Sequence, residues 1–104
     1  MENLLHGLRA AGEETRLRLL VLCAHSELTV SELTQILGQS QPRVSRHLKL
    51  LCDAGLLDRY QEGSWVYYRL SAKSGASLLA RTLVDLVPEA DPVVSRDLER
   101  LEAV

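Results

Sequence analysis

The most informative part of the sequence is SQPRVSRHLKLLCDAGLL, residues 40–57. Ser40 is suited to cap a helix, Pro42 is tolerated in a first helical turn, and Gly55 supplies a stop. Three apolar side chains recur between these signals at i, i+4 and i+7: Val44, Leu48 and Leu51. Side chains at this spacing share one face of a helix. The pattern therefore predicts a helix over residues 40–52 with its aliphatic face buried.

The opposite face of this helix is polar and basic. Its candidate contact residues are Ser40, Gln41, Arg43, Ser45, Arg46, His47 and Lys49. No acidic residue occurs between Leu33 and Cys52, although the whole chain has a formal net charge of −2. Short polar and basic side chains on an anchored helix suit the DNA major groove, and a locally positive face attracts phosphate. We expect this face to contact DNA, with His47 equally open to a phosphate contact or a structural bond to a backbone carbonyl.

Three further helices are expected before this one. Leucines at helical spacing predict a helix over residues 2–11. A second helix over residues 15–25 has a wide apolar surface, and we expect Thr15 to be its cap. The third helix opens at Thr29, which has a glutamate three residues further on as in a capping box, and ends at Gly38.

A hairpin and two helices are expected after residue 55. Residues 57–61 and 65–70 are rich in strand-forming side chains and flank a glycine-containing turn at 62–64. A helix follows at residues 75–87, and a last amphipathic helix lies within residues 89–104. The order α-α-α-α-β-β-α-α predicts a mainly α protein with a β-hairpin wing, an α+β winged helix-turn-helix.

Several motifs in this order resemble one protein family. They are ETRLRLL at 14–20, LTVSEL at 28–33, SQPRVSRHLKLL at 40–51 with Ala54-Gly55-Leu56, and VYYRL at 66–70. Together they resemble the ArsR family of bacterial regulators over roughly residues 8–87. The resemblance implies a homodimer joined through residues 4–11 and 75–87, with the helix at 40–52 in the major groove. It also implies a wing that touches the DNA backbone, and repression relieved by a ligand.

The resemblance also shapes the expected division of the chain and its operator. We expect residues 1–88 to form the DNA-binding and dimerisation domain, and 89–104 to support the dimer or to act as a connector. A twofold dimer places two reading helices about 34 Å apart, which predicts an inverted-repeat operator. The wing tip carries no basic residue, so Arg59 and Arg69 are its candidate DNA contacts.

Two alternative functions are compatible with the same motifs. The chain resembles the DNA-binding part of proteins that join an ArsR-type domain to an S-adenosylmethionine-dependent methyltransferase, and the sequence does not say whether the natural chain continues past Val104. No glycine-rich strand-turn-helix for the nucleotide occurs within it. A winged helix that only binds proteins is the second alternative, and it would lack the steep salt dependence of phosphate binding.

The usual metal ligands of the family are missing. Metal-sensing relatives carry cysteines in the segment that matches 28–33, whereas this chain has Thr29 and Ser31 there and Thr34 directly after it. The helix at 75–87 offers Asp85 but no histidine. We therefore expect no metal and no cofactor, and the sequence does not reveal the effector.

Cys23 and Cys52 are the only cysteines and therefore the only candidate redox thiols. Cys23 lies where thiol-sensing relatives keep one member of a redox pair, but its partner on the helix after the wing is absent. A buried packing role is the favoured interpretation for Cys23, and partial exposure for Cys52. Two unpaired cysteines, no membrane-spanning segment and no catalytic motif together favour a cytoplasmic protein that is not an enzyme.

Overall fold

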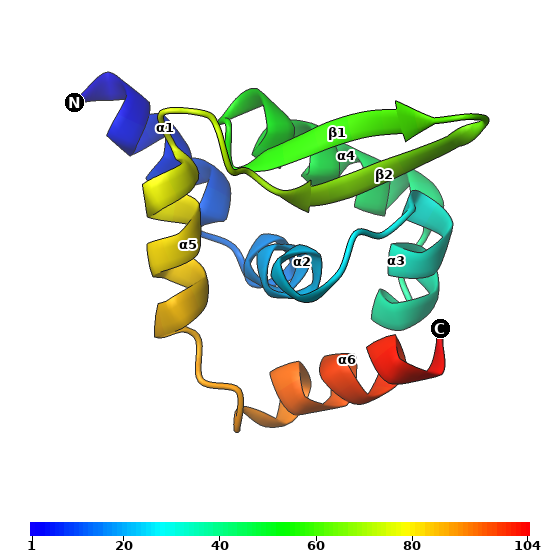
Figure 1. Ribbon diagram of the computed structural model, residues 1–104. Helices are drawn as coiled ribbons and strands as arrows, with labels where there is room; N and C mark the ends of the chain where they lie inside the picture. Colours follow the sequence, from blue (N-terminus) through cyan, green and yellow to red (C-terminus); the bar gives the residue numbers. More distant parts are fainter.

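The structure, a computed structural model, describes all 104 residues as six helices and one antiparallel hairpin (Figure 1). In chain order the elements are α1 (Glu2–Ala11), α2 (Glu14–His25), α3 (Val30–Leu37), α4 (Gln41–Asp53), β1 (Leu57–Glu62), β2 (Trp65–Leu70), α5 (Ser77–Leu86) and α6 (Pro92–Ala103). This order confirms the predicted winged helix-turn-helix. None of the helices is long and apolar enough to span a membrane.

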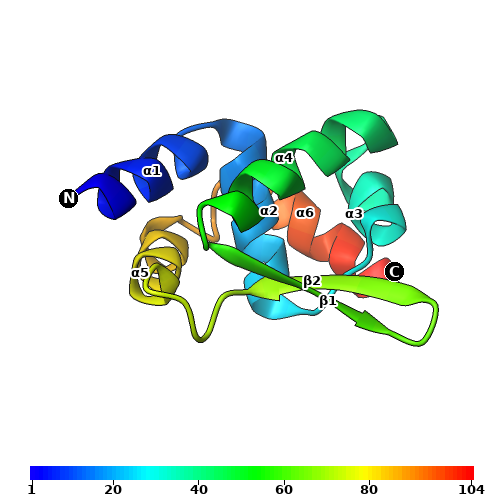
Figure 2. The same cartoon turned by 90° about the horizontal axis from the view of Figure 1, so that it is seen from above.

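Helix α2 forms the centre of the molecule, with the other helices and the hairpin arranged around it (Figures 1 and 2). Leu19, Leu20 and Leu22 of this helix are fully buried. The inward face of α4 packs on the same core, and its three predicted aliphatic residues are also fully buried: Val44, Leu48 and Leu51. The central prediction of an aliphatic anchor behind the polar face of α4 is thus confirmed.

The N-terminal caps of the helices differ in part from those predicted. In α3 both bonds of the capping box are present, and Gly38 ends the helix with a φ of 67°. The cap of α2 is Glu13, whose carboxylate accepts a bond of 2.9 Å from the backbone N–H of Arg16. The prediction of Thr15 as this cap is wrong, because Thr15 is buried inside the helix and accepts a bond from Gln39.

Smaller corrections apply to α4 and the hairpin. Ser40 occupies the cap position of α4, but its side chain makes no capping hydrogen bond. The hairpin turn is shorter than predicted, because Glu62 still pairs with Trp65. Only two residues therefore connect the strands, and Gly63 supplies the left-handed φ of 62° that this tight turn needs.

Helix α5 is shorter than the predicted 75–87, and α6 crosses beneath α2 toward α3 (Figure 1). A buried ion pair attaches α6 to the central helix: Arg18 donates two hydrogen bonds to Asp97, of 2.7 and 2.9 Å. At the far end of α6, Arg100 donates to the backbone carbonyl of Ile36 in α3. Helix α6 therefore packs on the preceding helices of the same chain, while the division of function at residue 88 stays a prediction.

Candidate nucleic-acid interface

Helix α4 lies on the side of the molecule that also carries the hairpin, away from α6 (Figure 1). Five of its predicted contact residues are exposed: Ser40, Gln41, Arg43, Arg46 and Lys49. Ser45 and His47 are half-buried. The fold thus brings most of the predicted α4 residues onto one solvent-facing surface, with a rigid core directly behind it.

Arg43 and Arg46 are free to take a ligand. No carboxylate lies within ion-pair distance of either guanidinium group. Lys49, by contrast, is held one turn further along α4 by Asp53, with an N–O distance of 2.9 Å. An exposed pair of this kind is weak, so phosphate can compete with Asp53 for the lysine. Arg43 and Arg46 are therefore the cations of α4 that can bind a phosphate or a base without first breaking an ion pair.

His47 points toward α2 and is held in place there. Its Nδ1 atom lies 3.1 Å from the guanidinium of Arg16 and 4.0 Å from the carboxylate of Glu13, and its side chain is only 13% exposed. Because a guanidinium only donates, His47 accepts this bond as a neutral imidazole. Of the two roles left open by the sequence, this geometry supports the structural one, with the Arg16 side chain as the partner instead of a backbone carbonyl.

The pKa of His47 is lowered, chiefly because burial disfavours the charged ring. Arg16, Arg43 and Arg46 lower it further, and only Glu13 opposes them. Folding therefore favours the neutral form, so its contribution to stability is complete above the unfolded-state pKa of about 6.5 and is lost as the pH falls below it. We expect the melting temperature to fall more steeply between about pH 7.5 and 5.5 in the wild type than in His47→Gln. Parallel pH profiles from scanning calorimetry would contradict this.

The two predicted wing contacts are placed differently from one another. Both arginines are exposed, but Arg69 also lies over the ring of Tyr60, 4.4 Å from its centroid. Tyr60 also stacks on Tyr67 and donates its hydroxyl to Glu27. Trp65, at the wing tip, is 61% exposed. Arg59 and Arg69 are therefore not equivalent, because part of the cationic surface of Arg69 already faces an aromatic ring.

Both cysteines are free thiols with raised pKa values. Cys23 is buried, and loss of hydration raises its pKa far above the ordinary range. Cys52 is half-buried, and mainly the same effect raises its pKa to about 11. Since the thiolate is the reactive form, neither cysteine is activated in this structure.

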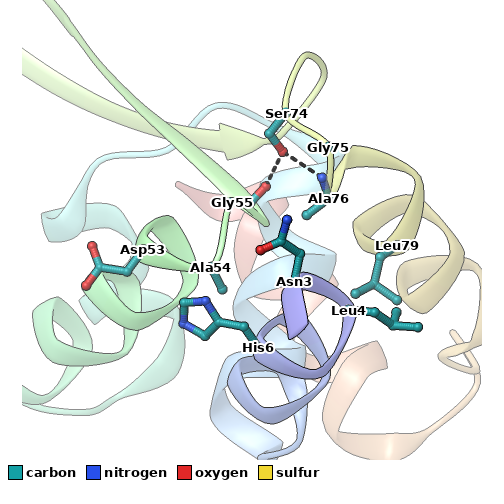
Figure 3. Close-up of a pocket in the computed structure, with 10 residues that line it drawn as sticks. All are labelled: Asn3, Leu4, His6, Asp53, Ala54, Gly55, Ser74, Gly75, Ala76 and Leu79. Carbon is teal, nitrogen blue, oxygen red and sulfur yellow. Dashed lines mark hydrogen bonds between the residues drawn. The ribbon is translucent and has the colours of Figure 1, made fainter. Parts of the chain in front are cut away.

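A shallow cavity of about 310 Å³ lies between α1, the end of α4 and the segment before α5 (Figure 3). Its polar side chains are Asn3, His6, Asp53 and Ser74. The hydroxyl of Ser74 donates to the carbonyl of Gly55 and accepts from the N–H of Ala76, so it joins the base of the hairpin to the start of α5. Nowhere in the chain do three His, Cys, Asp or Glu side chains converge in a way that could hold a metal ion.

Comparison with known proteins shows which family the chain belongs to. The family model described as "Bacterial regulatory protein, arsR family" matches residues 13–59. The arsenical resistance operon repressor of Escherichia coli is 50% identical over 60 residues, which cover 57% of this chain and 51% of the repressor. The repressor of the same name from Bacillus subtilis is 34% identical over 76 residues, covering 72% of both chains. The chain belongs to the ArsR family of bacterial regulatory proteins.

The fold of this ArsR protein also matches solved structures. A homodimeric winged helix-turn-helix DNA-binding domain from Mycobacterium bovis, a possible ArsR-family regulator, superposes with a TM-score of 0.68 at 26% identity. The match covers 81% of this chain and 80% of that domain. The family match runs from the cap of α2 to β1 and so contains all of α4. The chain spans about half the length of several curated relatives that it matches.

Proposed function

We propose that this ArsR-family protein binds an inverted-repeat operator as a homodimer and represses transcription, with α4 in the major groove. The observation that carries the proposal is the pair of unpaired, exposed arginines, Arg43 and Arg46, on a helix whose opposite face is fully buried. A rigid helix with free guanidinium groups near its N-terminal end suits readout of guanine and contact with phosphate. The E. coli and B. subtilis relatives named as operon repressors support the direction of the effect.

The remaining contacts follow from where each side chain lies. Gln41 and Arg43 stand in the first turn of α4, where they reach base edges, and Arg46 follows three residues later. Four further side chains are assigned to phosphates or to flanking contacts: Ser40, Ser45, Lys49 and Arg59. Arg69 makes a weaker contact because it already covers Tyr60. His47 acts from behind the interface through its bond to Arg16.

The dimer interface is assigned to α1 and α5, within residues 4–11 and 75–87. Five leucines are exposed on these two helices: Leu4, Leu5, Leu8, Leu78 and Leu86. The helices lie side by side in both views (Figures 1 and 2). Unpartnered apolar side chains of this size mark an interaction surface. The homodimeric state of the M. bovis domain supports the same arrangement, and such a regulator would act in the cytoplasm without catalysing a reaction.

The test is selection of bound sequences from a random DNA pool, followed by fluorescence anisotropy with the selected site. We expect an inverted repeat whose half-sites lie about one helical turn apart, and an affinity that falls steeply as salt rises. Repeating the selection with metals, reductant and S-adenosyl metabolites would reveal an effector. No enrichment, together with affinity that does not depend on salt, would instead indicate a protein-interaction module.

Substitution of the two exposed arginines tests whether the polar face of α4 contacts DNA. Replacing Arg43 or Arg46 by alanine should weaken operator binding by about 1–3 kcal/mol and leave the melting temperature unchanged, because neither side chain is packed or paired. Arg96→Ala is the matched control, since Arg96 is an exposed arginine of α6, the helix that lies on the other side of the molecule from α4 (Figure 1). Anisotropy at fixed salt measures the effect. Equal affinities for all three variants would remove α4 from the interface.

A further inference from the structure

One guanidinium group joins three helices of the protein. The Nε atom of Arg16, in the first turn of α2, donates to the carbonyl of Ala10 in the last turn of α1. Its Nη1 atom lies 3.1 Å from Nδ1 of His47 in the middle of α4. The backbone N–H of the same residue is bound by the carboxylate of Glu13, which caps α2. Arg16 therefore contacts both neighbouring helices while its own backbone position is fixed.

Arginine is well suited to this junction. The last carbonyl groups of a helix have no partner within it, so the Ala10 carbonyl needs a donor from elsewhere. A guanidinium group holds its donors in a rigid plane, which fixes the direction between two acceptors as well as their distance. His47 is an acceptor only while neutral, and its burial, with the nearby charges of Arg16, Arg43 and Arg46, favours that form against the opposing effect of Glu13. The sequence contained no signal for this contact, since Arg16 and His47 are 31 residues apart.

A second hydrogen bond attaches the turn between α3 and α4 to the same turn of α2. The side-chain amide of Gln39, in the turn between α3 and α4, donates to the hydroxyl of Thr15 at 3.1 Å. Thr15 and Arg16 thus hold the turn before α4 and the middle of α4 respectively. Of the two, only Arg16 continues to α1. Helices α1 and α4 also pack on each other directly, and the Arg16 side chain adds the hydrogen bonds that connect them.

We infer that Arg16 is a positioning residue that fixes α4 relative to α1 and thereby sets the half-site spacing the dimer accepts. The inference rests on the proposed function, in which α1 belongs to the dimer interface and α4 enters the major groove. In a twofold dimer, any rotation of α4 against α1 occurs in both protomers. The two rotations add, so a small change in the Arg16 contacts alters the distance between the two α4 helices by twice its effect in one protomer. Arg16 itself need not touch DNA.

The first measurement needs no DNA. Spin labels are placed on α1 and α4 by Arg9→Cys and Lys49→Cys, both at exposed positions, in a Cys52→Ser background. Cys23 stays because it is buried. Labelled protein is diluted into excess unlabelled protein, so that pulsed electron spin resonance reports the distance between α1 and α4 within one chain. We expect a narrow distribution in this background and a broad one when Arg16→Met is added.

Two variants of the acceptor and one control separate the hydrogen bond from general packing. His47→Gln keeps an acceptor oxygen and should keep the narrow distribution, whereas His47→Leu should broaden it as Arg16→Met does. Arg96→Met removes the same charge from an exposed site on α6 and should change nothing. A distribution that is equally narrow with Arg16 and with Met at this position overturns the inference, whatever the DNA measurements show.

The second measurement uses the selected operator and versions with half-sites moved one or two base pairs closer or further apart. The wild type should discriminate sharply among these spacings. Arg16→Met should lose about tenfold in affinity for the best spacing and much less for the others, because loosely oriented helices gain less from simultaneous binding. A parallel loss at every spacing would mean that Arg16 acts through charge or stability alone and would overturn the inference. A wild type that binds none of these sites would refute the proposed function, while the distance measurement would still decide the role of Arg16 within the fold.

Discussion

Replacing Asp97 by alanine should destabilise the protein by about 3–5 kcal/mol, the usual effect of removing one partner from a buried ion pair. The side chains of Arg18 and Asp97 are only 10% and 3% exposed, and both carboxylate oxygens accept a bond from the guanidinium. The hydrogen bond to Asp97 is also the main reason that the pKa of Arg18 is raised. Without Asp97 the guanidinium would stay charged inside the fold with no partner. Guanidinium chloride denaturation followed by circular dichroism measures the loss.

Two controls show whether the effect belongs to the pair. Glu99→Ala removes an exposed carboxylate from the same helix and should change stability by less than about 0.5 kcal/mol. The double variant Arg18→Met, Asp97→Leu removes both charges and should recover most of the loss, because hydrophobic replacements of a buried pair are often nearly neutral. A loss below about 1 kcal/mol for Asp97→Ala would mean that solvent reaches the pair.

The fold was predictable from sequence where the signals were local. The capping box at Thr29 and the glycine at residue 38 define α3 within a few residues. In α4, the aliphatic spacing, the proline in the first turn and Gly55 all agree. Agreement among independent local signals of this kind is what makes a helix readable without a structure.

The sequence did not reveal contacts between residues distant along the chain. Asp97 appeared to be one acid in an amphipathic helix, and its partner lies 79 residues away. Thr15 has the chemistry of a helix cap, but the preceding Glu13 takes that position and leaves Thr15 to bind Gln39. Propensity ranks residue types, whereas tertiary packing decides which of two neighbouring polar residues takes a given role.

In the candidate interface, too, local patterns were predictable from the sequence and contacts between distant residues were not. The free arginines of α4 follow from helical periodicity, which places Arg43 and Arg46 opposite the aliphatic face. The inward turn of His47 and the ring beneath Arg69 depend on α2 and on the partner strand, so no local pattern could show them. These two residues are the ones whose roles the structure changes most.

A glutamate in place of Leu86 should separate the proposed dimer and reduce operator affinity by about 10²–10⁴-fold, the usual gain from binding two linked sites at once. Leu86 and Leu78 are the most exposed leucines of α5, at 73% and 77%, so a charge at either position meets no obstacle within the protomer. In a dimer joined through α5 the same charge would be buried without a partner. Sedimentation velocity measures the oligomeric state, and anisotropy measures the affinity for the inverted repeat.

The loss of operator affinity in Leu86→Glu, compared with control variants, shows whether the dimer interface lies on α5 or elsewhere. Val104→Glu introduces the same charge at an exposed apolar position outside α1 and α5, and it should leave both mass and affinity unchanged. Binding of Leu86→Glu to an isolated half-site should match that of the wild type, because α4 and its buried anchor are untouched. If Leu86→Glu sediments as a dimer with full affinity, the protomers must join through another surface. If it becomes a monomer without losing affinity, the protein reads its site with one copy of α4, and the inverted repeat is not required.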